Sequence, residues 1–154
     1  MKNLYIFLLL LFYVSINAQV FKKISNSKID AERLELAKEF SALFFAKCEK
    51  QDYTEFKDYK MSVTLAKKLT EDNIKKTCES TSRSSGKITI SDLKTVYDFK
   101  YTRIYDPIDY FVFNILTENP NSNYKYAIVS IYHDQNIIDG VYLSDRLPSE
   151  KKKK

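Results

Sequence analysis

The sequence predicts an α+β protein in which N-terminal helices pack on an antiparallel β-sheet, after a cleaved signal peptide. Two observations lead to this prediction. Apolar residues recur at helical spacing before Ser85, and after it they alternate with polar residues. Helices that precede a run of strands are typical of an α+β domain with an antiparallel sheet.

Residues 1–18 have the three-part organisation of a secretory signal peptide. Lys2 is followed by an apolar run from Leu4 to Val14 and then by a more polar exit up to Ala18. A helix needs roughly 20 apolar residues to cross a bilayer, and this run is much shorter. We therefore expect a removable signal rather than an anchor, no integral membrane segment after processing, and a periplasmic or secreted protein.

The rest of the chain has the length of one domain. We expect an N-terminal segment at 19–28, a single α+β domain at 29–147 and a disordered basic tail at 148–154. The formal net charge is +5, but Lys2 and the four lysines at the end of the tail account for it, so the folded body is neutral. Nucleic-acid binders carry their excess positive charge on the folded surface, so no nucleic-acid partner is expected.

Residues 29–49 form the strongest predicted helix. Apolar residues at steps of three and four share one of its faces, namely Leu36, Phe40, Leu43, Phe44 and Cys48. Residues 63–69 predict a second, short helix, and residues 69–80 predict a third that begins at the N-cap Thr70. The polar stretch 80–87 is expected to be a loop that separates the helices from the sheet.

Cys48 and Cys78 are the two cysteines of the chain, and both are expected to point inward from different helices. Thiols of an exported protein can oxidise, so we expect a Cys48–Cys78 disulfide. The alternative is a pair of buried free thiols. No second pair of thiol or imidazole ligands lies near them in the sequence, so no metal site is expected.

From Ile88 onward the apolar pattern has a period of two, which predicts strands separated by turns at 106–109, 118–123 and 133–136, with a last strand around 137–143. Three sets of alternating residues are expected to form the core-facing wall of the sheet: Tyr97, Phe99 and Tyr101; Phe111, Phe113 and Ile115; Ala127, Val129 and Ile131.

Four local features carry a resemblance to a known superfamily: the amphipathic EFSALFFAKCEKQDYTEF, the capped LTEDNIKK, the strand meander and the final IIDGVYL. Together they resemble the nuclear transport factor 2-like, or cystatin-like, superfamily, and in particular its small exported bacterial domains of unknown function. The resemblance covers about residues 29–145. It implies a curved, cone-like antiparallel sheet that wraps the first helix. Members of the superfamily include isomerases, dehydratases and binding modules, so the resemblance selects no function.

Enzymes of that superfamily use acidic, histidine and tyrosine side chains at the mouth of the cone. Here His133 is expected in a turn, Asp98 on the outer side of its strand and Asp109 beside a turn, all in contact with solvent. We therefore predict no catalytic residue and no cofactor, and a non-enzymatic protein is favoured. A small isomerase or hydrolase that uses Asp98 or His133 is the weakest of three hypotheses.

Aromatic residues are the most informative excess, because eight of the 12 tyrosines lie between Tyr97 and Tyr142. Five rings on the expected inner wall either fill the cone or hold a small apolar ligand: Tyr97, Phe99, Tyr101, Phe111 and Phe113.

Four tyrosines of opposite parity form an expected interface with a protein partner or a second copy: Tyr110, Tyr124, Tyr126 and Tyr132. Ordinary β propensity explains the same four tyrosines. The first hypothesis is therefore an exported binding module that uses a tyrosine-rich sheet, and the second is a protein that holds a small ligand inside the cone.

Overall fold

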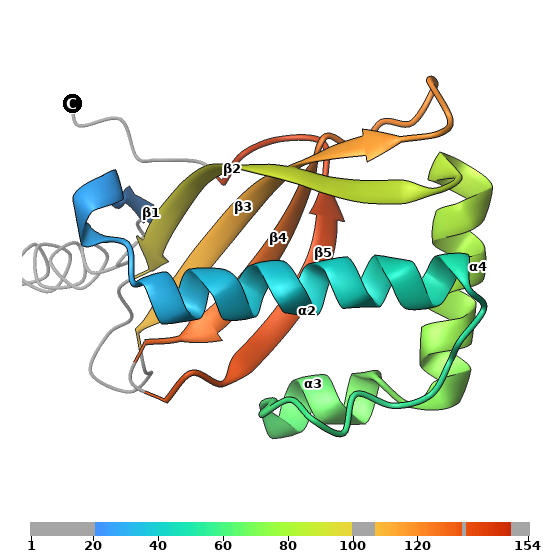
Figure 1. The fold of residues 1–154 in the computed structure, drawn as a ribbon, viewed down its shortest axis with the longest axis horizontal. Helices are drawn as coiled ribbons and strands as arrows, with labels where there is room; N and C mark the ends of the chain where they lie inside the picture. Colours follow the sequence, from blue (N-terminus) through green and yellow to red (C-terminus); the bar gives the residue numbers. More distant parts are fainter. Residues whose placement is uncertain (1–20, 100–106, 134, 149–154) are drawn as a thin grey trace, which may run out of the picture.

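A computed structural model describes residues 21–99, 107–133 and 135–148. It confirms the α+β class, with the helices preceding the main part of an antiparallel sheet (Figure 1). The elements in chain order are β1 (Phe21–Lys23), the 3₁₀ helix η2 (Asn26–Lys28), α2 (Ala31–Glu49), α3 (Val63–Lys68), α4 (Glu71–Ser85), β2 (Ile88–Phe99), β3 (Ile108–Thr117), β4 (Tyr126–Tyr132) and β5 (Ile138–Ser144). The predicted signal peptide, Tyr101 and residues 149–154 of the predicted tail lie outside the described residues.

The sheet has five strands in the order β1-β2-β3-β4-β5, and every neighbouring pair is antiparallel. Strand β1 was not expected, because three residues are too few to show an alternating pattern. It pairs Phe21 with Phe99 and Lys23 with Tyr97. The predicted N-terminal segment therefore contributes a strand to the sheet.

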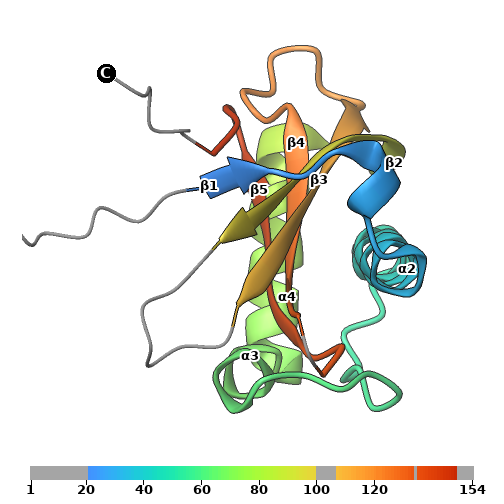
Figure 2. The same cartoon turned by 90° about the vertical axis from the view of Figure 1, so that its left-hand side faces the viewer.

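Helix α2 lies along one face of the sheet, and α4 crosses the C-terminal end of α2 (Figure 1). Figure 2 shows α2 on one side of the strands. The cluster on the opposite side, around Tyr97, Val112 and Ile128, contains no residue of a described helix. We call the side that packs on α2 the helix face and the opposite side the outer face. Within the described residues, no helix has the length and apolar character needed to cross a bilayer.

The main core lies between α2 and the helix face. Phe40 and Phe44 of α2 belong to the same buried cluster as Phe111, Phe113 and Val129 of the sheet. Burial of each such side chain stabilises the fold by about 1.5–3 kcal/mol relative to exposure. The long helix is therefore held mainly by aromatic packing.

One member of the predicted stripe on α2 does not belong to the core. Leu43 is 39% exposed, whereas Ala37 and Ser41 are fully buried. Steps of four join Ala37 to Ser41 and Phe40 to Phe44, and these positions define the buried stripe. The expectation for Leu43 was wrong because its helical position falls beyond the margin of that stripe.

Helix α4 is longer than predicted and includes most of the stretch that was expected to be a loop. It continues to Ser85, and Gly86 ends it with a φ of 66°. A glycine adopts this left-handed region without the steric cost that other residues carry. A Cβ at Gly86 would also lie 2.8 Å from Glu118 Oε2, so the space at this helix end is filled.

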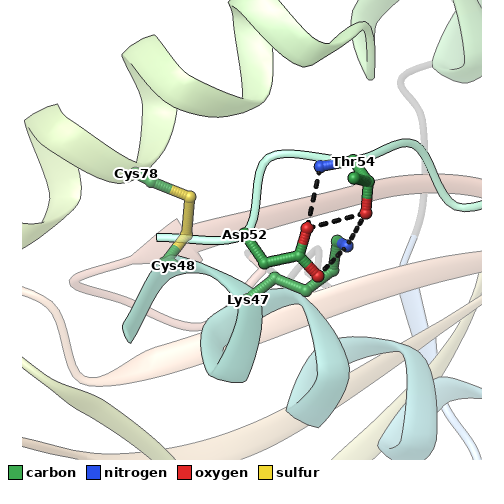
Figure 3. The surroundings of a disulfide bond; sticks show 5 residues. All are labelled: Lys47, Cys48, Asp52, Thr54 and Cys78. Atoms are coloured by element: carbon green, nitrogen blue, oxygen red, sulfur yellow. Dashed lines mark hydrogen bonds and ion pairs between the residues drawn. A yellow bond between two sulfur atoms is a disulfide. The ribbon is translucent and has the colours of Figure 1, made fainter. Parts of the chain in front are cut away.

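The predicted disulfide is present between Cys48 at the end of α2 and Cys78 in α4, with an S–S distance of 2.01 Å (Figure 3). Its two Cα atoms lie 4.9 Å apart, and both residues belong to the main core cluster. The bond therefore links α2 and α4, the two longest of the described helices, where they cross.

A polar contact beside the disulfide fixes the turn that follows α2 (Figure 3). The buried Lys47 ammonium donates hydrogen bonds to Asp52 Oδ2 at 2.7 Å and to Thr54 Oγ1 at 2.6 Å. It also lies 5.4 Å from the centroid of the Phe56 ring. The hydrogen bond from Lys47 is the main cause that holds the pKa of Asp52 well below its usual range. Lys47 is therefore a paired structural residue and not an available charge.

Candidate functional site

The strand register separates the five aromatic residues that were expected on one inner wall. Val96 lies opposite Phe111, and Tyr97 lies opposite Tyr110. Directly opposed residues share a face of the sheet. Phe111 is in the main core with α2, whereas Tyr97 belongs to a separate cluster on the outer face.

The expectation of a shared wall is therefore wrong for Tyr97 and Phe99. Alternation shows which residues of a strand share a face, but not which face that is. In addition, the β2–β3 register shifts on either side of Leu93, so the first part of β2 gives no guide to the phase of the last part. Tyr101 lies outside the described residues.

The inner wall is filled by its own side chains. Phe111 is 0% exposed and Phe113 is 1% exposed, and both lie in one cluster with Phe40 and Phe44. The described core therefore leaves no surface of these two rings for a small ligand to contact.

Rings also pack together on the outer face. Phe21 of β1 lies 4.7 Å from Phe99 and 5.2 Å from Tyr110, measured between ring centroids, and 6.2 Å from Tyr97. Leu147 packs against the same cluster from the segment after β5. Sequence reasoning missed Phe21 because it lies in the short strand β1.

Three of the four tyrosines predicted at an interface share the outer face. Tyr110 lies opposite Ser130 and Tyr132 opposite Ile108, while Tyr126 lies opposite Asn114 on the same side as Tyr110. All three are partly buried.

The fourth predicted tyrosine lies outside the strands, and an unpredicted tyrosine of β5 shares the outer face. Tyr124 precedes β4, so no strand pairing places it on a face of the sheet, and it lines a hollow beside α4. Tyr142 of β5 lies opposite Ile128 on the outer face and is 43% exposed. Alternation in the last strand, where Tyr142 stands between Val141 and Leu143, is the signal that could have found it. We call Tyr110, Tyr126, Tyr132 and Tyr142 the tyrosine face.

A buried charge cluster closes the end of the sheet where α2 begins. Asp109 is 2% exposed, and its Oδ2 accepts a hydrogen bond from Arg33 Nε at 2.9 Å. Arg33 also donates from Nη1 to the backbone oxygen of His133 at 2.8 Å. His133 Nε2 lies 3.8 Å from the same Asp109 oxygen.

These positions correct two expectations about acidic residues. Asp109 was expected in solvent, and Asp98 was expected on the outer side of β2. Asp109 lies opposite Ile131 of the main core, and Asp98 lies opposite Asp109, so both are on the helix face. The sequence gives no sign of this, because the partner Arg33 is 76 positions away from Asp109.

Burial is the main cause that raises the pKa of the Asp109 carboxyl above its usual value, while the charges of Arg33 and His133 act in the opposite direction. Within the described residues, Asp109 Oδ1 has no hydrogen-bond partner. A carboxyl beside an imidazole can exchange protons. However, the Asp109 side chain is only 3% exposed and one oxygen is held by Arg33, so a bound molecule has little access to it. We interpret the cluster as a contact that ties the first turn of α2 to the sheet.

The raised pKa makes the stability contribution of Asp109 depend on pH. Below about pH 4 the carboxyl is neutral in both the folded and unfolded states, and as the pH rises through the folded pKa the folded state must accept a buried charge. We expect wild type to lose stability relative to Asp109→Asn over this window. Urea unfolding of both proteins between pH 4 and 7 measures the difference. A gain for wild type would instead mean that the ion pair with Arg33 dominates burial.

The described residues contain no group of three or more histidine, cysteine, aspartate and glutamate side chains that could hold a metal ion. Comparison of the chain with protein-family models, with curated proteins and with solved structures found no match.

Proposed function

We propose that the chain is an exported, non-enzymatic binding module that contacts a protein partner through the tyrosine face. The observation that carries the proposal is the strand register, which places these four tyrosines of β3, β4 and β5 on the outer face. Tyrosine combines a large contact area with a hydrogen-bonding tip and is enriched in protein interfaces.

Export to the periplasm or to the outside is part of the proposal. A formed disulfide is typical of oxidising compartments, and the features of residues 1–18 are those of a signal peptide. The resemblance to the nuclear transport factor 2-like superfamily is likewise proposed, and it is supported by a long helix packed on a strand meander.

The two alternative functions have less support. A small apolar ligand inside the cone would need to contact Phe111 and Phe113, whose rings are closed off by the core. An isomerase or hydrolase would need an accessible acid or base, whereas Asp109 is buried and paired with Arg33. His133 is 44% exposed, but its carboxylate neighbour belongs to the same structural contact.

Site-specific photo-crosslinking in the cells that make the protein tests the proposal. A benzophenone side chain would replace Tyr126 or Tyr142, and Glu35 on the exposed side of α2 is the control position. We expect a discrete adduct from both tyrosine positions and none from Glu35. An adduct of twice the chain mass would identify a second copy as the partner. Adducts at Glu35 alone, or at none of the three positions, would contradict the proposal.

A further inference from the structure

Strand β5 is the last described strand of the sheet, and few described residues pair with its far edge. Among the described residues, Met61 forms one parallel bridge to Ile138 at the start of the strand. Ser62 N donates to Ile138 O at 2.9 Å, and Ile138 N donates to Lys60 O at 3.0 Å. Beyond Ile138 no described segment pairs with this edge, which leaves backbone groups of the kind that accept an additional strand.

A hollow lies on each side of the unpaired edge. The helix-side hollow, between α4 and β5, has a volume of about 430 Å³ and is lined by Phe44, Phe45, Val141 and Leu143. The outer hollow also has a volume of about 430 Å³, and its apolar lining includes Ile128, Leu147 and Pro148. Tyr142 lines both hollows, so the two meet at β5.

This arrangement fits the geometry of an added strand. Successive side chains of an extended chain point to opposite faces of the sheet. A segment paired with β5 would therefore place one side chain in the helix-side hollow and the next in the outer hollow. Backbone hydrogen bonds would supply affinity and the two hollows would supply selectivity, as in other cases of strand addition.

The charges that line the hollows indicate the chemistry of the occupant. Lys76 is the charged residue that lines the helix-side hollow, where Thr77 and Ser80 of α4 add hydroxyl groups. Arg146 lines the outer hollow, but its Nε lies 3.9 Å from Asp145 Oδ1, so its charge already has a partner. None of the described residues that line either hollow is acidic. An acidic side chain would therefore complement Lys76 in the helix-side hollow, and an apolar side chain would fit Ile128 and Leu147 in the outer hollow.

We propose that the edge of β5 binds an extended segment of a partner protein in which apolar and acidic residues alternate. This inference rests on the proposed function, because it specifies how and where the partner binds. It adds a backbone-mediated contact at the border of the tyrosine face.

Two short synthetic peptides test the proposal, one alternating valine with glutamate and the other alternating valine with lysine. Fluorescence anisotropy measures their binding to the mature chain. We expect the acidic peptide to bind more tightly than the basic one, and Lys76→Glu to weaken its binding about fivefold. The matched control Lys75→Glu reverses another exposed lysine of α4 that lines neither hollow, and it should leave binding almost unchanged.

Amide hydrogen exchange supplies a second readout, because strand addition should slow exchange in residues 139–144 when the acidic peptide is bound. Equal binding of the two peptides, equal loss in Lys76→Glu and Lys75→Glu, or binding without this protection would overturn the proposal. Protection that increases with protein concentration and no peptide would also overturn it, in favour of a second copy. If a benzophenone at position 126 still gives its crosslinked adduct in the Lys76→Glu variant, the tyrosine face retains its proposed function although the edge does not bind the partner.

Discussion

Phe111→Ala should destabilise the protein by about 3–5 kcal/mol. Phe111 is 0% exposed and lies on the central strand β3 within the core beneath α2. Its truncation removes buried apolar surface and leaves a cavity that the surrounding rings fill only in part. Because a domain of this size has a total stability of about 5–15 kcal/mol, the variant should lie close to unfolding. Urea denaturation followed by circular dichroism measures the loss, since the chain has no tryptophan to report it.

Leu116→Ala is the matched control for this experiment. Leu116 lies on the same strand but is 66% exposed, so its truncation should change stability by no more than about 0.5 kcal/mol. Similar losses for both variants would mean that Phe111 is not in a closed core, and a ligand inside the cone would again be favoured.

Loss of the disulfide should have an effect of comparable size. The bond closes a loop with a sequence separation of 30, for which the chain-entropy relation gives about 3–4 kcal/mol. The double variant Cys48→Ala/Cys78→Ala should therefore unfold at a lower urea concentration than oxidised wild type.

Reduction provides the internal control for the disulfide. Wild type treated with a thiol reductant should approach the double variant in stability, whereas the double variant itself should not respond to the reductant. If wild type were also insensitive, the thiols would be unpaired in solution, which is the alternative that the sequence leaves open.

The fold class and the disulfide were predictable because each depends on a local pattern. The steps of four on α2 place Phe40, Phe44 and Cys48 on one side, and Ile74 and Cys78 share a side of α4 in the same way. Two inward-facing cysteines on neighbouring helices can therefore come close enough to form a disulfide. Leu43 shows the limit of this reasoning. It follows Phe40 by a step of three, yet it lies outside the buried stripe and is 39% exposed.

The faces of the sheet were not predictable to the same extent. Tyr97 and Phe99 alternate with their neighbours as a strand requires. Which face of the sheet they occupy depends on the pairing of Val96 with Phe111, and residues so far apart in the sequence give no local signal of that pairing. Asp109 illustrates a second limit, because a carboxylate beside a turn is buried here only through a contact with Arg33. The sequence therefore predicts that the candidate site contains tyrosines, but it does not predict which tyrosines share a face of the sheet.

The bond between Cys48 and Cys78 also gives the chain a closed covalent ring that contains the connection after α2, all of α3 and the first half of α4. A protease that cuts once within the exposed parts of this ring would not divide the protein into separable pieces. The two resulting polypeptides would remain one molecule until a reductant opened the ring, so nicked and intact protein would differ on a reducing gel but not on a non-reducing one.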